Sequence, residues 1–360
     1  MKRHVTVVAL ALVGMLALAS FSAQAGEKTI IIISKSLQNQ FYQAAFVGAN
    51  AAGKDFGVSV VVNGPDAESN IPQQVEQVQA AINQRPAALV LAACDPTSVQ
   101  EALARAKENK IPVIGFDSGV PGDTSGAVIG TAATNNVNAG GVVADNLADS
   151  PAFQAKVKAA TAANPAVIAV LAQDSTSGSI VQRTDGFVYA LKKRVEALDS
   201  SLVGAVSIGG QDNWSVPSSK PATVKIVVTV PPTTNQADIQ SVANAMLLVP
   251  NTVAIFAANQ DAVNGLISST ADGTELNRQT GRYKDILVVG FDAGSNQKDA
   301  VRSGAFFGSV TQDPYQMGYA SIKMAAEAAD GKPVSDIDTG AKWYNSKNID
   351  NPDIALLLYD

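Results

Sequence analysis

The 360-residue sequence has few of the side chains on which catalytic and metal-binding chemistry depends: its only histidine is His4 and its only cysteine is Cys94. His4 lies in a segment that we interpret below as a signal peptide, so the mature chain would have no histidine, which excludes Ser-His-Asp and Cys-His catalysis and histidine-ligated zinc, copper or iron sites. One cysteine excludes thiolate clusters, CxxC redox centres and a disulfide within the chain. The sequence also lacks a P-loop, an EF-hand loop and a GxGxxG fingerprint. We therefore expect no metal site and no cofactor.

Charge is scarce as well, since only 16% of residues are charged and the formal net charge is −6. An acidic surface repels polyanions, which argues against nucleic acid and anionic lipid as partners. Hydrophobic residues make up 46%, too high a fraction for a disordered chain. The length is sufficient for two globular domains.

The N-terminus has the three parts of a secretory signal peptide. Lys2 and Arg3 precede a nearly unbroken apolar run over residues 5–19, and Ala23-Gln24-Ala25 supplies the small residues of a cleavage site. The run is short for a membrane span of ~20 residues, and no cysteine is available for lipid attachment. The sequence therefore predicts a signal peptide over 1–25 and an unanchored mature protein of net charge −8 in a periplasm.

Strands and helices alternate along the rest of the chain. The run of four isoleucines within Thr29–Ser34 indicates a strand buried on both faces, as in a parallel sheet between helices. The patterns predict further strands over 58–62, 88–92, 113–116, 166–171, 253–257 and 286–291, and helices over 41–55, 72–84, 97–109, 138–149, 180–198, 261–269 and 315–329. This alternation is typical of the α/β class with open, doubly wound sheets.

Two halves of the sequence resemble each other. A strand, a helix and a second strand ending in Gly115-Phe116-Asp117 are matched by the same order of elements ending in Gly290-Phe291-Asp292. The repeated order predicts two similar domains. The stretch Gly204–Thr234 breaks the pattern with its glycines and prolines, and we interpret it as an inserted hairpin or long loop.

In open parallel sheets, ligands bind beyond the carboxyl ends of the strands. The residues that follow the predicted strands are polar or aromatic: Lys35, Asn39, Phe41, Tyr42, Asp95, Asp117, Ser118, Asn259 and Asp292. Carboxylates accept hydrogen bonds from neighbouring hydroxyls, amides both donate and accept, and aromatic faces cover the C–H surface of a sugar ring. This set suits a neutral polyol better than a phosphate or an acid.

Seven short motifs together carry a resemblance to a known family, although each motif alone is weak. They are 36–42 (SLQNQFY), 95–97 (DPT), 111–118 (IPVIGFDS), 183–187 (RTDGF), 256–259 (FAAN), 288–292 (VVGFD) and 312–314 (QDP). In this order they resemble the periplasmic sugar-binding proteins of the ribose-binding type, the type I receptors of ABC importers. The resemblance covers the mature chain except Gly204–Thr234 and the tail after Pro333.

The resemblance implies two doubly wound parallel-sheet lobes joined by a three-strand hinge. The N-terminal lobe would comprise 27–133 plus 313–337, and the C-terminal lobe 134–312 plus 338–360. A sugar would lie between the lobes, contacted by Asn39, Phe41, Tyr42, Asp95 and Asp117 from the first lobe. Arg183, Asn259 and Asp292 would meet it from the second lobe, and Gln312 from the hinge.

The chain also departs from the family pattern. Lys35 stands where the family has a small hydroxyl residue, and Ser118 where it has an arginine. A second-lobe aromatic is missing near Thr234, for which Trp214 is a candidate substitute. Asp95 has an alternative role as the cap of the helix that follows it, and Lys35 one as the partner of a nearby carboxylate.

The resemblance implies that the chain is the substrate-binding component of an ABC importer, for a monosaccharide or similar polyol, and we expect that it is not an enzyme. Its expected partners are that ligand and a membrane permease, and we expect a monomer. An alternative is a receptor for a non-sugar solute such as autoinducer-2 or a nucleoside, which Lys35 and Ser118 favour. A carboxylate-dependent periplasmic hydrolase is a further alternative, which the repeated strand-end motif disfavours.

Overall fold

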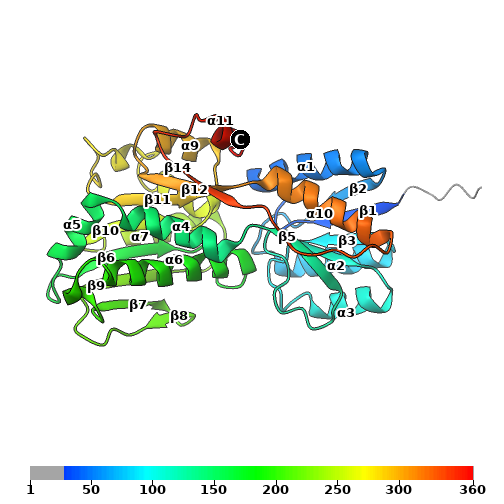
Figure 1. Ribbon diagram of the computed structural model, residues 1–360, viewed down its shortest axis with the longest axis horizontal. Helices are drawn as coiled ribbons and strands as arrows, with labels where there is room; N and C mark the ends of the chain where they lie inside the picture. The colour runs from blue at the N-terminus through cyan, green and yellow to red at the C-terminus, as the bar shows by residue number, and fades with distance from the viewer. Residues whose placement is uncertain (1–27, 360) are drawn as a thin grey trace, which may run out of the picture.

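The computed structural model describes residues 28–359 and has two lobes that lie side by side (Figure 1). The predicted signal peptide lies outside the described residues. Each lobe is built on one sheet with helices packed against it, so the predicted α/β class with two largely parallel sheets is confirmed.

The first lobe has a six-stranded sheet in the order β13-β5-β4-β3-β1-β2, and every neighbouring pair is parallel. The strands are β1 (Thr29–Ile33), β2 (Ser59–Asn63), β3 (Ala88–Leu91), β4 (Val113–Phe116), β5 (Val128–Ala133) and β13 (Ile337–Asp338). The helices of this lobe are α1 (Gln40–Phe56), α2 (Ile71–Asn83), α3 (Gln100–Glu108) and α10 (Pro314–Ala329).

The isoleucine run explains why this sheet is covered on both faces. Alternate residues of a strand point to opposite faces. Ile30 and Ile32 join the buried cluster that contains Phe46, whereas Ile31 and Ile33 join the one that contains Val78. Both faces of β1 are therefore dry, as the unbroken β-branched run predicts.

The second lobe has an eight-stranded sheet in the order β14-β12-β11-β10-β6-β9-β7-β8. The pairs β12–β14 and β7–β8 are antiparallel and the other pairs are parallel. The strands are β6 (Ala166–Leu171), β7 (Val206–Gln211), β8 (Trp214–Val216), β9 (Val224–Thr229), β10 (Thr252–Ala257), β11 (Leu287–Phe291), β12 (Gly308–Gln312) and β14 (Ala341–Tyr344). The helices are α4 (Asn136–Ala148), α5 (Pro151–Ala159), α6 (Gly178–Glu196), α7 (Gln236–Leu247), α8 (Gln260–Ser268), α9 (Ser295–Arg302) and α11 (Pro352–Ala355), with short 3₁₀ turns η1 (Ser200–Leu202) and η2 (Thr274–Leu276).

The chain passes between the two sheets three times, after β5, after β12 and between β13 and β14. Each passage is short, because α4 begins three residues after β5 and α10 begins two residues after β12. Three short connections form a hinge of the predicted kind, with the gap between the lobes beside it (Figure 1).

The interpretation of Gly204–Thr234 as an insertion was wrong for most of its length. β7 and β8 do form an antiparallel hairpin at the sheet edge, but β9 lies between β6 and β7 and is parallel to both. Val224, Ile226 and Val228 are buried in the core of the second lobe. The surrounding prolines and glycines belong to the connections, and they obscured a short β-branched strand.

Glycines let two pairs of helices pack closely together, and these pairs position the helix ends that face the gap between the lobes. In the second lobe, a Cβ on Gly140 of α4 would overlap the carbonyl of Arg183 on α6, and one on Gly186 would overlap the carbonyl of Val137. In the first lobe, Gly48 of α1 and Gly318 of α10 form the equivalent contacts. The same device therefore recurs in both lobes, in line with the internal similarity of the sequence.

Candidate functional site

A small cavity between the two lobes, here called the cleft cavity, collects polar and aromatic side chains from strand ends and helix starts. Its volume is about 20 Å³. It is lined by Lys35, Asn39, Phe41, Tyr42, Glu68, Asp117, Ser179, Ile180, Arg183, Asn259, Asp292 and Gln312. Nine of the eleven residues predicted from the sequence are in this set, and Asp95 and Ser118 are the two that are not.

Asp95 and Ser118 make local contacts instead. Asp95 accepts hydrogen bonds from the Thr97 amide (2.8 Å) and the Ser98 hydroxyl (2.7 Å), which fits the alternative of a turn-capping role. The Ser118 hydroxyl donates to the carbonyl of Ala93 (2.9 Å), and the residue borders a separate 380 Å³ cavity beside the hinge. Neither side chain is among those that line the cleft cavity.

Two aspartates anchor the site, one at the end of β4 and one at the end of β11. Both have left-handed backbone geometry, with φ 54° at Asp117 and 74° at Asp292. Aspartate tolerates this conformation better than most residues. The repeated Gly-Phe-Asp sequence is thus a repeated strand-end turn that aims a carboxylate at the gap between the lobes.

Two asparagines hold helix N-termini at the cavity. The side-chain oxygen Oδ1 of Asn39 accepts a hydrogen bond from the backbone amide of Phe41 (2.9 Å) at the start of α1. The side-chain oxygen Oδ1 of Asn259 accepts one from the backbone amide of Ala262 (3.1 Å) at the start of α8. Each capping side chain satisfies backbone donors that the helix leaves free, so it is fixed where it meets the cavity.

On the first-lobe side, Lys35 is the centre of a buried ionic cluster. Its amino group lies 3.0 Å from Glu68 Oε2 and 3.7 Å from Asp117 Oδ2, and the Tyr42 hydroxyl donates to Asp117 at 2.7 Å. Burial alone would lower the pKa of Lys35, but the charges of Glu68 and Asp117 outweigh it and keep the pKa above its ordinary value. Burial raises the pKa of Glu68 to about 7, while Lys35 acts in the opposite direction.

On the second-lobe side, Arg183 and Asp292 form the corresponding pair, with Nη1 4.0 Å from Oδ2. The Arg183 guanidinium donates twice to Asn136 Oδ1 (2.8 and 3.1 Å) and once to the Ala258 carbonyl (2.7 Å), and it lies 3.5 Å above the ring of Phe291. This set of contacts fixes a buried cation that would otherwise be costly.

Asp292 is held by the backbone and by the hinge. Its carboxylate accepts hydrogen bonds from the Gln260 amide (3.0 Å) and from Gln312 Nε2 (2.6 Å). Burial raises the pKa of Asp292, and Arg183 and these two donors oppose the rise. Because Gln312 is the last residue of β12, the carboxylate is linked directly to one of the three hinge passages.

Contacts across the gap show that the lobes are closed on each other. The Lys35 amino group donates to the Ser177 hydroxyl (2.9 Å), Asn39 Nδ2 donates to Asp261 (3.3 Å), and Gln260 donates to Gln40. A cavity of about 20 Å³ has room for about one water molecule and is far too small for a sugar ring. The lobes must therefore separate before any sugar-sized ligand can enter.

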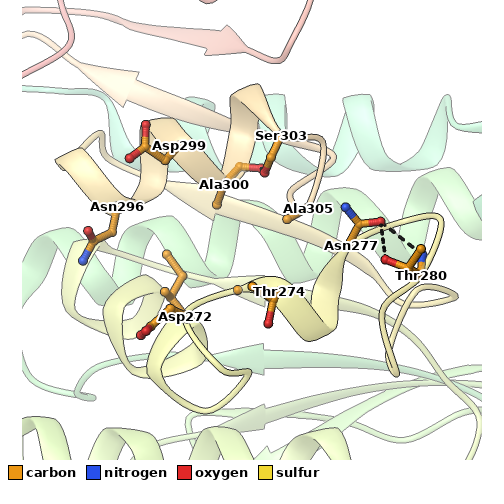
Figure 2. Close-up of a pocket in the computed structure, with 11 residues that line it drawn as sticks. Asp272, Thr274, Asn277, Thr280, Asn296, Asp299, Ala300, Ser303 and Ala305 are labelled. Carbon is orange, nitrogen blue, oxygen red and sulfur yellow. Dashed lines mark hydrogen bonds between the residues drawn. The ribbon is translucent and has the colours of Figure 1, made fainter.

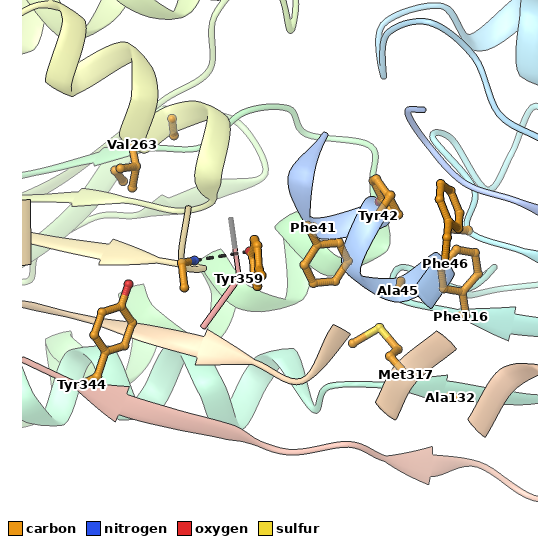
Figure 3. Packing of buried hydrophobic residues seen from close by; sticks show 14 of the residues in the cluster. Phe41, Tyr42, Ala45, Phe46, Phe116, Ala132, Val263, Met317, Tyr344 and Tyr359 are labelled. Carbon is orange, nitrogen blue, oxygen red and sulfur yellow. Dashed lines mark hydrogen bonds between the residues drawn. The ribbon is translucent and has the colours of Figure 1, made fainter. Parts of the chain in front are cut away.

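Sequence reasoning missed Glu68 and Tyr359. Tyr359 comes from the tail, where its hydroxyl accepts a hydrogen bond from the Ala293 amide (3.3 Å) beside Asp292. Its ring packs edge-on against Phe41 of the first lobe, with centroids 6.0 Å apart (Figure 3). Glu68 lies in the loop after β2 and Tyr359 in the C-terminal tail, and neither position belongs to a motif that the sequence analysis used.

The suggestion that Trp214 substitutes for the missing aromatic was wrong. Trp214 is fully buried in the core of the second lobe, and its indole nitrogen donates to Asp185 (2.8 Å). It packs inside the lobe and does not line the cleft cavity. Tyr359 is the second-lobe aromatic that contacts the first-lobe ring.

A larger cavity, of 610 Å³, lies elsewhere. It lies in the second lobe between η2 and α9, where Figure 2 shows Asp272, Asn296 and Asp299 at its border. Within residues 28–359, no helix is both long and apolar enough to cross a membrane. Over the same range, no three acidic, histidine or cysteine side chains are grouped as metal ligands.

Comparisons with known proteins extend over most of the chain. Residues 30–333 match the family described as periplasmic binding protein domain. The ribose import binding protein of Salmonella typhimurium is 25% identical over 317 residues, which cover 88% of this chain and 90% of that protein.

Two solved structures resemble the fold closely. One, described as an ABC transporter, LacI family transcriptional regulator, from Brachyspira murdochii, has a TM-score of 0.76 at 35% identity and covers 93% of this chain and 99% of that one. The other, a carbohydrate transporter solute binding protein from Agrobacterium radiobacter in complex with D-arabinose, has a TM-score of 0.72 at 28% identity, with the same coverage.

Proposed function

Since this chain belongs to the periplasmic binding protein domain family, as its motifs predict, we propose that it is the substrate-binding component of an ABC importer for a monosaccharide or similar polyol. The observation that carries the proposal is the cleft cavity, where both lobes and the hinge contribute buried carboxylate, amide and aromatic side chains. The names of the matched relatives point to the same class of ligand.

The chemistry of the cavity suits hydroxyl groups. Asp117 and Asp292 accept hydrogen bonds, Arg183 donates them, and the amides of Asn39, Asn259 and Gln312 do both. Phe41 and Tyr42 supply apolar faces for the C–H surface of a ring. With Lys35, these nine side chains are our proposed ligand-binding set, and the role is one of binding without catalysis.

Hinge closure is the proposed mechanism. The two lobes, 27–133 plus 313–337 and 134–312 plus 338–360, separate about the three passages, and a sugar that bridges them stabilises the closed form. The closed form then docks on the membrane permease. The proposal includes secretion to the periplasm by a signal peptide cleaved after Ala25, and action as a monomer.

Lys35 gives less support to a non-sugar ligand than its position in the sequence suggests. Its amino group already contacts Glu68, Asp117 and Ser177, so its charge is compensated inside the protein. A lysine whose role is to bind an acidic or zwitterionic solute would instead lack such partners within the protein.

A thermal-shift screen of the mature protein tests the proposal. The panel contains D-ribose, D-arabinose, D-allose and sugar alcohols, with nucleosides and autoinducer-2 as the competing classes. At 100 times its dissociation constant a ligand adds ~2.7 kcal/mol, which raises the melting temperature of a chain of this length by about 4 °C. A shift with a neutral sugar supports the proposal, and a shift only with a competing class overturns it.

A further inference from the structure

Glu68 is a charged residue of the cleft cavity that the strand-end pattern does not account for, and it pairs with Lys35. Glu68 lies in the loop between β2 and α2, yet its side chain is only 7% exposed and reaches the cavity. Its neighbours Asp66 and Ser69 are exposed on the same loop. The loop therefore turns one carboxylate inward and leaves the adjacent polar residues in solvent.

The two members of the pair differ in how well they are satisfied. The Lys35 amino group donates a hydrogen bond to Ser177 (2.9 Å) and forms ion pairs with two carboxylates, Glu68 at 3.0 Å and Asp117 at 3.7 Å. Glu68 Oε2 is buried and accepts no hydrogen bond of good geometry within the described chain, although it faces Lys35. A buried carboxylate oxygen with unused acceptor capacity is costly unless another donor reaches it.

The charges around the cavity limit which donors can reach it. Three carboxylates line the cavity, from Glu68, Asp117 and Asp292, against the two cations Lys35 and Arg183. Asp261, hydrogen-bonded to Asn39 at the rim, adds a further acidic group. Burial already raises the pKa of Glu68 to about 7, so the site opposes additional negative charge from an anionic ligand, whereas hydroxyl groups bring only donors and acceptors.

We infer that Glu68 is a specificity-determining residue of the ligand site, where it accepts a hydrogen bond from a ligand hydroxyl while Lys35 holds its carboxylate in position. The pair selects neutral polyhydroxy ligands and rejects sugar acids. The inference rests on the proposed function and adds to it a residue and a class of excluded ligand.

A purely structural role for Glu68 makes a different prediction. If Glu68 served only to neutralise Lys35, its removal would affect binding only while Lys35 is present. A double-mutant cycle with Glu68→Gln, Lys35→Met and the combined variant separates the two roles. Glutamine keeps the size of the side chain, and Asp66→Asn on the exposed part of the same loop is the matched control.

The experiment is isothermal titration of the mature protein with D-ribose, D-arabinose and D-fucose, and with D-galacturonate as the acidic analogue of D-fucose. We expect the wild type to bind a neutral sugar and to bind D-galacturonate at least about 100-fold more weakly than D-fucose. Glu68→Gln should raise the dissociation constant of the neutral sugar by about 10- to 100-fold in the wild-type background, and by a smaller but measurable factor in the Lys35→Met background, where the carboxylate loses the group that positions it. Asp66→Asn should leave it unchanged.

Three outcomes would overturn the inference. Wild-type affinity in a Glu68→Gln protein with a normal melting curve would remove Glu68 from recognition and leave the proposed function intact. Equal affinities of Lys35→Met and the double variant would assign Glu68 the structural role. Failure of the wild type to bind any of the neutral sugars would refute the proposed function, and the inference with it. Should Glu68→Gln not fold, Glu68→Asp provides the same comparison with a shorter carboxylate.

Discussion

Substitutions of Asp292 test its contribution to the stability of the protein separately from its contribution to ligand binding. The carboxylate accepts hydrogen bonds from the Gln260 amide and Gln312, lies 4.0 Å from Arg183, and occupies a left-handed backbone position. Asn tolerates that backbone geometry and preserves the size of the side chain, whereas Ala loses both advantages. We therefore compare Asp292→Asn with Asp292→Ala.

The direction of the pKa shift sets the expected effect on stability. Burial raises the pKa of Asp292 even with the opposing charge of Arg183 included, so the ionised carboxylate is unfavourable in the folded state. The folded protein binds this proton more tightly than the unfolded chain, whose pKa is ~3.9. The contribution to stability is complete below that pH and is lost as pH rises through the raised pKa.

The neutral Asn avoids this loss, although its amide group meets the Gln260 N–H less well. We expect the free energy of unfolding of Asp292→Asn to lie within about 1 kcal/mol of the wild type at pH 7. Relative to the wild type, the variant should gain as pH rises from 4 to 7. Asp292→Ala should lose about 1–2 kcal/mol more than Asp292→Asn, from backbone strain alone.

Binding should respond far more strongly than folding. A charge-assisted hydrogen bond contributes ~1.5–3 kcal/mol, so loss of the carboxylate should weaken sugar binding by about 10- to 100-fold for each hydroxyl that it contacts. Urea denaturation measures the stability of each variant, and titration calorimetry with the best sugar of the screen measures its affinity. Asp299→Asn, on the exposed face of α9, is the control and should change neither quantity.

Wild-type affinity in Asp292→Asn would refute the placement of the carboxylate against the ligand. Equal stability of Asp292→Asn and Asp292→Ala would refute the argument from left-handed backbone geometry.

Neighbouring glycines of α4 should behave oppositely in urea denaturation: Gly140→Ala, which meets the next helix, should lose about 1–3 kcal/mol, and Gly141→Ala, whose Cβ meets nothing within 4 Å, should gain about 0.5–1 kcal/mol. An unchanged free energy of unfolding in Gly140→Ala would mean that α4 and α6 can move apart freely. Trp214→Phe should lose about 1–2 kcal/mol of stability with its hydrogen bond and leave the sugar dissociation constant unchanged, and weaker binding would bring that residue back to the site. Tyr359→Ala should raise the sugar dissociation constant about 2- to 10-fold by removing the edge-on contact with Phe41, and an unchanged value in calorimetry would show that the tail does not support the closed form.

The sequence by itself determined the class of fold and most of the candidate site. The isoleucine run of β1 is a local property of the chain, and its burial on both faces follows from strand geometry. Residues at strand ends can be predicted in the same way, because parallel strands bring their carboxyl ends to one edge of the sheet wherever the connections run. This is why the positions of Asp117, Asp292 and Asn259 along the chain were enough to predict that they line the cavity.

Only the tertiary structure decided between residues whose local contexts look alike. Asp95 follows a strand as Asp117 does, but its carboxylate is taken up by the turn that begins the next helix. The strand β9 lies between proline-rich connections, and its place in the sheet depends on pairing with β6 and β7, which the local sequence does not specify.

Glu68 and Tyr359 reach the gap between the lobes from a loop and from the C-terminal tail, more than 290 residues apart in sequence. Neither position has a periodic neighbour that would fix its direction. Glu68 lines the cavity and Tyr359 contacts Phe41 beside it because the sheets, the glycine-packed helices and the three hinge passages bring both lobes around the same point. That arrangement is a property of the folded chain as a whole, and no local stretch of the sequence encodes it.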